Sequence, residues 1–370
     1  MELVRIGIIG TSGWADMFFL PVLSSYARAD LVAICGRNQE RAGEMAAKYS
    51  IPQVYSDYRQ MIDDAHLDAL VVASPDDLHY EMVMCALDAG LHVLCEKPLA
   101  NNADQARQML DKAETAGAKH MVNYPWRWLP QIQYIKHLLD KGYVGRAYQG
   151  SFRFSFSSRH HRDYSWSTDA DRSNGVVGNL GSHMIDMARW LLGDVASVSA
   201  SLTTQVERDG VNGRPLKPAN DSAFVLLDFS SGAHCSIANS YVAHLTDEGG
   251  VAVALYGENG TLRSEYFIGT LDHVVYGARR DEDTIRPLDM PSTYLQGVVK
   301  GDMFAAFRSE AIGPRLFIDS ILDNKVVEPN FCDGYENQRV IDAALESQCS
   351  GRRITIVDNH DKVKLQPSLR

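Results

Sequence analysis

The sequence predicts two domains, a doubly wound parallel α/β domain over residues 1–125 and an α+β domain with a large open antiparallel sheet over residues 126–370. Three observations support this prediction. A chain of 370 residues is longer than one hydrophobic core usually serves. The first 125 residues alternate short apolar runs with helical stretches, which is typical of a parallel sheet. Beyond residue 145 apolar and polar residues alternate, as in strands with one exposed face.

The strands of the first domain are predicted from nearly continuous apolar runs, as expected of strands buried on both faces. Between them lie stretches that are long enough and periodic enough for helices. Gly90 and Gly117 follow two of these helices as natural C-terminal residues. The predicted strands are 4–10, 31–35, 67–73, 92–95 and 120–122, and the predicted helices are 37–49, 76–89 and 103–116.

The strands of the second domain are predicted from a period of two. In segment 148–156 the even positions are apolar or Gly and the odd ones are polar, which indicates a half-exposed strand. Helical stretches interrupt the strands and are expected to group on one side of the sheet. The predicted strands are 148–156, 197–206, 222–229, 233–242, 251–256 and 271–276, and the predicted helices are 183–192, 314–323 and 335–348.

Composition and charge exclude several classes of function. The formal net charge is −11, and no dense block of Lys and Arg stands out, so we expect no nucleic-acid or anionic-membrane partner. No apolar run reaches the roughly 18 residues of a membrane span, and the N-terminus lacks the pattern of a signal peptide. The six Cys form no Cys-x-x-Cys pair, which indicates a reducing compartment and hence a cytoplasmic protein.

The turn after the first strand resembles a dinucleotide fingerprint. That fingerprint is Gly-x-Gly-x-x-Gly/Ala, and it opens a helix whose N-terminus receives the pyrophosphate. Its second Gly is Ser here, which offers a hydroxyl as well as a backbone N–H to a phosphate oxygen, and one Gly is displaced by a residue. Because the turn follows the first strand of a βαβ unit, we expect a Rossmann domain that binds a nicotinamide dinucleotide. The turn runs Gly10, Thr11, Ser12, Gly13, Trp14, Ala15.

The end of the second strand bears on which dinucleotide binds. An Asp or Glu there would accept hydrogen bonds from the ribose 2′-hydroxyl and repel a 2′-phosphate. This chain has Arg37 instead, and its first carboxylate is Glu40. A guanidinium suits a phosphate. We therefore expect NADP(H) to be favoured, with NAD(H) as the alternative.

Four motifs follow one another along the chain. They are the N-terminal fingerprint, Ala73-Ser74-Pro75-Asp76 with His79, Glu96-Lys97-Pro98, and residues 178–186, Gly-Asn-Leu-Gly-Ser-His-Met-Ile-Asp. In this order and spacing they resemble the Gfo/Idh/MocA oxidoreductases over nearly the whole chain. The resemblance implies a nicotinamide cofactor between a Rossmann domain and an open-sheet domain, and oxidation or reduction of a carbinol carbon of a sugar, cyclitol or related polyol. The expected cofactor-binding residues are Gly10, Thr11, Ser12, Trp14, Ala15, Arg37, Ser74, Pro75, His79, Glu96 and Lys97.

Two residues carry the catalysis that the resemblance implies. Lys97 follows a parallel strand, at the edge of the sheet where ligands bind, and its ammonium can stabilise alkoxide character on the reacting oxygen. His183 can accept the hydroxyl proton as general base. Ser182 is expected to cap the helix that begins at His183. Asp186 is expected either to orient His183 or to favour the N-terminus of that helix by its charge.

Residue 179 departs from the family pattern, which carries Asp four residues before the His. Asn179 can hold a substrate hydroxyl, but it cannot ionise and so cannot share a proton. Three interpretations stay open. His183 works alone with Lys97; the enzyme is slow or has a shifted pH optimum; or the chain binds its cofactor without turnover. We count Asn179 with Lys97 and His183 as the candidate catalytic residues.

The substrate side is predicted from segments rich in aromatic and hydrogen-bonding groups. Segment 156–166 supplies such groups, and segment 124–128 joins the two domains and holds an Arg of the kind that the family places near the substrate. No pair of His has the spacing of a helical metal site, so we expect no metal. The expected substrate-binding residues are Lys97, Arg127, His160, Trp166, Asn179 and His183.

Two alternative functions stay open, and the sequence also predicts an oligomer. The first function is a nicotinamide-assisted hydrolase, epimerase or dehydratase acting on a sugar, and the second is a non-catalytic regulator that binds a dinucleotide and a sugar. The open sheet should leave apolar residues in need of a cover, such as Phe224, Leu226 and Val253. We therefore expect a homodimer or homotetramer through this sheet.

Overall fold

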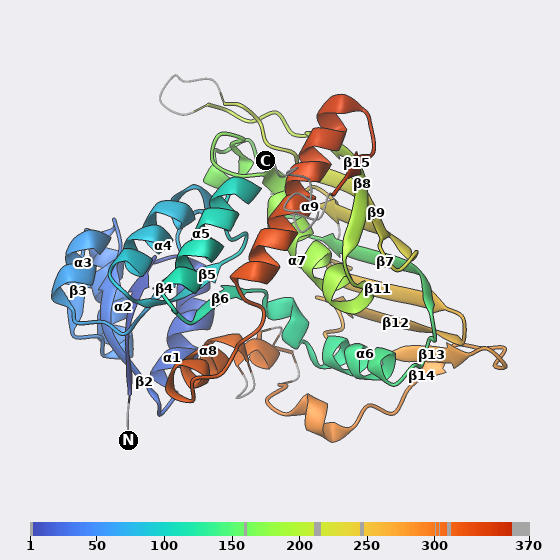
Figure 1. The fold of residues 1–370 in the computed structure, drawn as a ribbon, viewed down its shortest axis with the longest axis horizontal. Helices are drawn as coiled ribbons and strands as arrows, with labels where there is room; N and C mark the ends of the chain where they lie inside the picture. Colours follow the sequence, from blue (N-terminus) through green and yellow to red (C-terminus); the bar gives the residue numbers. More distant parts are fainter. Residues whose placement is uncertain are drawn as a thin grey trace, which may run out of the picture.

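The computed structural model describes residues 3–158, 161–210, 216–244, 248–299, 301–302, 304–308 and 312–356. Two sheets lie side by side, with the long helices α7 (Gly175–Leu192) and α9 (Phe331–Ser350) between them (Figure 1). In the figure the first sheet and the helices from its own part of the chain are blue to cyan, whereas α8 is orange-red; the second sheet runs from green to orange, with β15 in red.

The first sheet is fully parallel, with strand order β3-β2-β1-β4-β5-β6. This is the order of the doubly wound dinucleotide-binding fold, and the direction of winding reverses between β1 and β4. One face is covered by η1, α1, α2 and α8, and the other by α3, α4 and α5. The strands are β1 (Val4–Ile9), β2 (Ala29–Cys35), β3 (Gln53–Tyr55), β4 (Ala69–Val72), β5 (His92–Glu96) and β6 (His120–Asn123). The helices are η1 (Ala15–Phe19), α1 (Leu20–Ser24), α2 (Gln39–Tyr49), α3 (Tyr58–Asp64), η2 (Asp76–Leu78), α4 (His79–Asp88), α5 (Ala103–Thr115) and α8 (Gly313–Leu322).

The second sheet has order β14-β13-β12-β11-β7-β10-β9-β8-β15 and is antiparallel except for the parallel pair β7 and β10. Its inner face packs against α7 and α9. Along β9, buried and exposed residues alternate, so that Phe224 and Leu226 lie on the outer face. The strands are β7 (Ala147–Ser155), β8 (Val195–Thr203), β9 (Ser222–Phe229), β10 (His234–Ser240), β11 (Gly250–Gly257), β12 (Gly260–Phe267), β13 (Tyr276–Arg279), β14 (Arg286–Pro287) and β15 (Ile354–Thr355).

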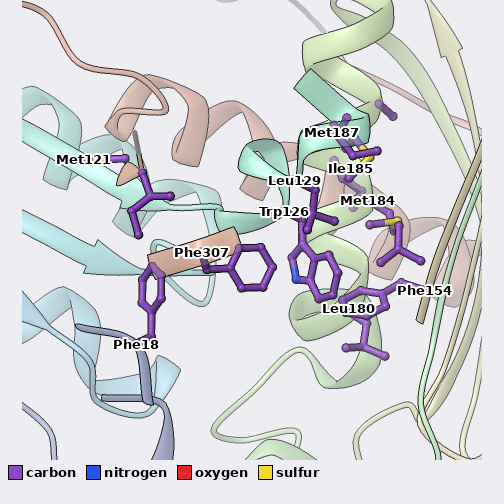
Figure 2. Close-up of a cluster of buried hydrophobic side chains, with 14 of the residues drawn as sticks. Phe18, Met121, Trp126, Leu129, Phe154, Leu180, Met184, Ile185, Met187 and Phe307 are labelled. Carbon is purple, nitrogen blue, oxygen red and sulfur yellow. The ribbon is translucent and has the colours of Figure 1, made fainter. Parts of the chain in front are cut away.

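Aromatic side chains form a core between the two sheets. Figure 2 shows Phe18 of η1 beside Phe307 of η6 (Ala305–Arg308), then Trp126 of η3 (Pro125–Trp128), then Phe154 of β7. The ring centroids are 6.5 Å apart for Phe18 and Phe307, 5.3 Å for Phe307 and Trp126, and 4.7 Å for Trp126 and Phe154. This continuous packing fixes the two sheets relative to each other and so defines the space between them.

The structure confirms the predicted fold class and corrects several elements. The strand expected at 271–276 is wrong, because regular pairing there begins only at Tyr276. The helix expected at 183–192 begins eight residues earlier, at Gly175. Val253 was expected on an open face but is 2% exposed, because it belongs to the inner side of β11. Helix α8 packs on β1, β5 and β6 and so joins the first sheet from the far end of the chain.

Candidate functional site

A cleft of about 410 Å³ lies where the carboxyl ends of β1, β4 and β5 face α7 and β7. Ligands of open α/β sheets bind at this edge, next to the point where the winding reverses. Predicted residues in its lining are Ser12, Trp14, Ser74, Pro75, Glu96, Lys97, Trp166, Asn179 and His183. The residues that complete it are Ala73, Asp76, Trp126, Phe154, Phe156, Leu180 and Phe304.

Lys97 lies in this cleft directly after β5. Its ammonium donates a hydrogen bond to Asn179 Oδ1, with Nζ and Oδ1 2.8 Å apart. Burial lowers the pKa of Lys97 from its usual value of 10.5, while the nearby carboxylates of Asp76 and Glu96 act in the opposite direction. The charged form of Lys97 is therefore less stable in the cleft than in water.

His183 lies across the cleft in the middle of α7. The rings of Tyr124, Trp126 and Phe154 surround the imidazole edge-on, at centroid distances of 6.2, 6.1 and 5.8 Å. Its Nδ1 is buried without a hydrogen-bond partner, which leaves Nε2 as the nitrogen that can meet a ligand. Burial, reinforced by the charge of Lys97, holds the pKa of His183 well below its usual value, so the imidazole is neutral.

Glu96 anchors one wall of the cleft. Its carboxylate accepts hydrogen bonds from Trp14 Nε1 at 2.8 Å and from Asn123 Nδ2 at 2.5 Å, and its second oxygen accepts the backbone N–H of Lys97 at 3.2 Å. Burial raises the pKa of Glu96, and the Lys97 charge and these hydrogen bonds oppose the rise. Glu96 thus holds the indole of Trp14 against the cleft.

Asp76 is a titratable residue of the cleft lining that was not among the predicted site residues. It is 4% exposed and stands at the start of η2, four residues beyond the end of β4. Burial raises the pKa of its carboxyl group from 3.8 to about 7, although Lys97 and a hydrogen bond from Ser173 oppose the rise. The signal in the sequence was its place in the Ser74-Pro75-Asp76 motif after a buried strand.

Aromatic rings supply most of the remaining wall. The six aromatic residues that line it are Trp14, Trp126, Phe154, Phe156, Trp166 and Phe304. Trp126 stood within a segment that the sequence singled out. Phe304 lies 178 residues beyond Trp126 in the sequence, so no local pattern indicated it.

The turn after β1 fits a dinucleotide. Gly10 has a φ of +119°, and a Cβ there would lie 2.3 Å from the carbonyl oxygen of Ala73, so only glycine is tolerated. Beyond it, Gly13 borders open space, and the first N–H groups of the following helix have no acceptor within the helix. Ser12 Oγ accepts the backbone N–H of Ala15 at 3.2 Å, which leaves its hydroxyl proton free to donate. Arg37 is exposed just beyond β2.

Several predicted site residues have other surroundings. Arg127 is 3% exposed and pairs with Asp186, through Nε–Oδ2 at 2.7 Å and Nη2–Oδ1 at 2.5 Å, so it does not line the cleft. Asp186 therefore neither orients His183 nor starts a helix, and Ser182 is no cap because it lies inside α7. Gly178 and Gly181, which are poor helix formers, hid the first turns of that helix from sequence reasoning.

The remaining predicted residues lie behind or outside the cleft. His79 is fully buried, with Nδ1 2.8 Å from the carbonyl oxygen of Pro98 and Nε2 3.0 Å from that of Ser74, so it ties the β4 and β5 loops together. Ala15 is buried and Thr11 packs on Gly36, so neither belongs to the lining. His160 lies outside the described residues.

The described residues contain neither a metal-ligating cluster nor a membrane-spanning helix. No group of three or more His, Cys, Asp or Glu side chains in that part of the chain could hold a metal ion. Among the helices that the structure describes, none is both long and apolar enough to cross a membrane.

Known proteins resemble this chain over most of its length. A family model described as "Oxidoreductase family, NAD-binding Rossmann fold" matches residues 4–124, and one for the GFO/IDH/MocA C-terminal domain matches residues 132–263. Levoglucosan dehydrogenase of Pseudarthrobacter phenanthrenivorans is 26% identical over 356 residues, covering 90% of each chain. The NADP⁺-dependent scyllo-inositol 2-dehydrogenase of Bacillus subtilis is 32% identical over 215 residues, covering 56% of this chain and 65% of the relative.

Solved structures support the same fold. Levoglucosan dehydrogenase in complex with NADH and levoglucosan superposes with a TM-score of 0.86, at 24% identity, over 96% of this chain and 100% of the other. The two family models together span more than half of the chain, and they follow one another in the order of the two sheets. The chain therefore belongs to the Gfo/Idh/MocA family and is an NAD(P)-dependent oxidoreductase that acts on CH–OH groups.

Proposed function

We propose that this protein oxidises or reduces a carbinol carbon of a neutral cyclic sugar, cyclitol or similar polyol. The observation that carries the proposal is one cleft that combines Lys97, Asn179 and His183 with aromatic walls at the carboxyl edge of the parallel sheet. Relatives that act on an anhydrosugar and on an inositol support the same class of substrate.

The charges in the cleft favour a neutral substrate. Lys97 is the cationic side chain among the described residues that line it, and it already faces the carboxylates of Asp76 and Glu96. A phosphate or carboxylate on the substrate would be desolvated there without a guanidinium to pair with. The aromatic walls suit the C–H faces of a sugar ring instead, because these faces are apolar while the hydroxyl groups at the ring edge remain free for hydrogen bonds.

Lys97 and His183 would receive the reacting hydroxyl group from opposite sides of the cleft. Lys97 Nζ would donate a hydrogen bond to the reacting oxygen and stabilise its negative charge as the hydride leaves. His183 Nε2, which is neutral, would accept a hydrogen bond and orient the hydroxyl group. Asn179 holds Lys97 by the 2.8 Å hydrogen bond and keeps its amide N–H groups for the substrate. When bound, the nicotinamide supplies the hydride acceptor or donor.

The turn after β1 would hold the pyrophosphate on the N–H groups that follow Gly10, with Ser12 as a further donor. Arg37 is exposed beyond the end of β2 and would pair with a 2′-phosphate there, so we propose NADP(H) as the favoured cofactor. Ser12 and Trp14 belong to the turn after β1 and also line the cleft, so a dinucleotide bound at the turn would reach the cleft there.

A substrate screen with both cofactors tests the proposal. Neutral sugars and cyclitols, together with phosphorylated and carboxylated counterparts as controls, are followed by nicotinamide absorbance. We expect net reduction of the cofactor with a neutral polyol and none with the anionic counterparts. Conversion of a sugar without net cofactor reduction would indicate the hydrolase, epimerase or dehydratase, and cofactor and sugar binding without conversion would indicate the regulator.

The Lys97→Ala variant tests the catalytic assignment. Loss of one donor to a developing oxyanion typically costs about 100- to 1,000-fold in rate, so we expect a loss of that size with nearly unchanged dinucleotide affinity. The matched control is Lys141→Ala, which removes an exposed Lys at the end of α6 (Pro130–Asp140) and should leave turnover unchanged. Unchanged turnover in Lys97→Ala would remove Lys97 from the mechanism.

A further inference from the structure

We propose that Asp76 is the carboxylate that receives the substrate's hydroxyl proton, passed on by Lys97. Asp76 would thus be the proton acceptor in a chain that has Asn instead of a carboxylate at position 179. This inference rests on the proposed function. It assigns a catalytic role to a residue of the loop after β4. This residue lies outside both the motif at 178–186 and the Glu96-Lys97-Pro98 motif.

The topology brings Asp76 and Lys97 to the same place. Strands β4 and β5 are parallel neighbours, with Val72 opposite Cys95, so the residues that follow them emerge at one edge of the sheet. Asp76 and Lys97 both line the cleft there. Asp76 also affects the Lys97 ammonium more strongly than Glu96 does. Lys97 therefore faces an amide supplied by α7 and the charges of Asp76 and Glu96 at the edge of the first sheet.

The other groups near Lys97 are poorer proton acceptors than a carboxylate with free oxygen lone pairs. Asn179 has no titrating atom. His183 is buried beside the Lys97 charge, and both effects disfavour its imidazolium form. Glu96 already accepts three hydrogen bonds, from Trp14, Asn123 and the backbone of Lys97. A proton leaving the substrate thus needs another acceptor.

The carboxylate of Asp76 has oxygen lone pairs that can accept a proton. Within the described residues its side chain accepts one hydrogen bond, from Ser173 Oγ at 3.4 Å, which is long and therefore weak. The charged and polar groups that face Asp76 are Lys97 and Glu96 from the β5 loop, Asp77 from its own turn, and Ser173 ahead of α7. Lys97 and Ser173 favour the carboxylate, whereas burial, Glu96 and Asp77 favour the protonated acid. The balance lies at about pH 7, near the ordinary operating pH of a general base.

Oxidation would break two bonds of the substrate. The hydrogen of the carbinol C–H bond would leave with the bonding electron pair, as a hydride, which the oxidised nicotinamide would accept. The Lys97 ammonium would give one of its protons to the Asp76 carboxylate, and the resulting amine would take up the proton of the breaking O–H bond. The carbonyl product forms, Lys97 returns to its starting state, and the carboxylic acid of Asp76 releases its proton to solvent. Reduction is the reverse, with Asp76 as the proton donor.

The Asp76→Asn variant, which keeps the shape and removes the titration, is the first test. We expect oxidation to fall by about 100-fold or more at neutral pH, within the range of a lost general base, and the limb of the pH–rate profile near neutrality to disappear. Dinucleotide affinity should be nearly unchanged. The Ser173→Ala variant keeps the carboxylate but removes a hydrogen bond to its charged form, so it should move that limb to higher pH.

The rescue experiment separates a proton acceptor from a structural residue. Asn179→Asp places a carboxylate at the amide that lies 2.8 Å from Lys97 Nζ, so the double variant Asp76→Asn/Asn179→Asp should regain most of the lost rate. A merely structural role of Asp76 would not be rescued from α7. A full rate and an unchanged profile in Asp76→Asn, or a loss that Asn179→Asp does not restore, would overturn the proposal.

An infrared titration of the protein without cofactor makes the test independent of the proposed function. The parent-minus-Asp76→Asn difference spectrum should show a protonated carboxyl band that disappears as the pH rises through about 7; the other buried carboxyl groups, such as Asp186, contribute equally to both proteins and cancel. If this band is present but no polyol is turned over, the proposed function fails while Asp76 still titrates near neutrality. If polyol turnover is present but the band is missing, the proton acceptor proposal fails alone.

Discussion

At the scale of single residues, the buried carboxyl group of Asp76 should lower the free energy of unfolding at neutral pH. Its pKa is raised from 3.8 to about 7, so the folded state binds a proton that the unfolded chain has already released between those pH values. The unfolding free energy contributed by this group therefore falls as the pH rises from about 4 to about 7 and stays low above that. At about 1.4 kcal/mol per pKa unit the cost reaches about 4 kcal/mol.

The Asp76→Asn variant should consequently be more stable than the parent at pH values above about 7, by up to about 4 kcal/mol, and equally stable near about pH 4. Urea unfolding at several pH values measures this difference. Asp63→Asn, which removes an exposed carboxylate from α3, is the control and should change stability little at any pH. A variant that is less stable than the parent above neutral pH would show that the carboxylate stabilises the fold. Stability gained together with activity lost is typical of a residue kept for function.

Arg37 should decide the choice of dinucleotide. Its side chain is exposed beyond β2, where a 2′-phosphate would lie. A hydrogen bond to a charged group is worth about 1.5–3 kcal/mol, so Arg37→Ala should weaken NADP(H) binding by about tenfold or more and leave NAD(H) binding nearly unchanged. Calorimetric titration of both cofactors measures this, with Arg146→Ala as the exposed control far from the turn. A parent that binds NAD(H) more tightly than NADP(H) would contradict the prediction.

At the scale of elements, the buried ion pair between Arg127 and Asp186 fixes the position of α7. Arg127 belongs to η3, next to the first sheet, and also reaches Asp333 of α9 at 3.0 Å. Removal of one partner of a buried pair costs about 3–5 kcal/mol because the other charge stays buried. We therefore expect Asp186→Ala to lose stability of that order, whereas Asp209→Ala, which breaks an exposed pair with Arg162, should lose about 1 kcal/mol or less.

Denaturant unfolding of the two variants checks this, and similar losses in both would show that the buried pair has no special weight. Because α7 also carries Asn179 and His183, Asp186→Ala should in addition lower turnover, although Asp186 does not line the cleft.

Helices and strands could be predicted where a local hydrophobic pattern determines them. They could not be predicted where tertiary contacts between distant segments determine them. The five buried strands of the first domain were predicted within a few residues, since a continuous apolar run has few alternatives. Strand β12 was missed because Ser264 occupies an inward position, where it is 2% exposed, and so interrupts the alternation of apolar and polar residues. In α7, Gly178 and Gly181 suggested a loop, yet the absence of a side chain at 181 allows Asn239 to approach, 3.2 Å from where a Cβ would be.

The residues of the candidate site also fall into two groups, those that motifs predicted and those that depend on tertiary contacts. Lys97, Asn179 and His183 were expected together from motifs, and the cleft does bring them together. The partner of Arg127 and the wall supplied by Phe304 depend on how distant segments meet, so no spacing in the sequence indicated them. The prediction of a helix cap at Ser182 was wrong for a related reason, because tertiary packing of α7 overrides the weak helix propensity of its glycines.

At the scale of the whole molecule, the cleft exists because α8 and α9 return to the first sheet after the chain has built the second. Phe317 of α8 and Phe331 of α9 are both fully buried against elements of the first sheet. Together with the aromatic core at Phe307 and Trp126, they fix the spacing of the two sheets (Figure 2). A site that joins Lys97 of one sheet to His183 of the other depends on that spacing.

The outer face of the second sheet should be covered by a second copy of the chain. Phe224 and Leu226 of β9 are 63% and 59% exposed there, and among the described residues no helix packs over them. Their neighbours on β8 and β10 are small, since Ser201 and Ala238 flank Phe224 in the register. A flat apolar face of this kind suits self-association across a two-fold axis.

Light scattering should therefore give at least twice the chain mass of 41.1 kDa at micromolar concentration, as a dimer or as a tetramer built from such dimers. The double variant Phe224→Glu/Leu226→Glu should give monomers, because four carboxylates would be buried without partners in each interface. Val326→Glu is the matched control, since Val326 is 83% exposed and lies away from the sheet, after α8. It should leave the mass unchanged. A parent of monomeric mass would contradict this assembly, and an unchanged mass in the double variant would place the interface on another face.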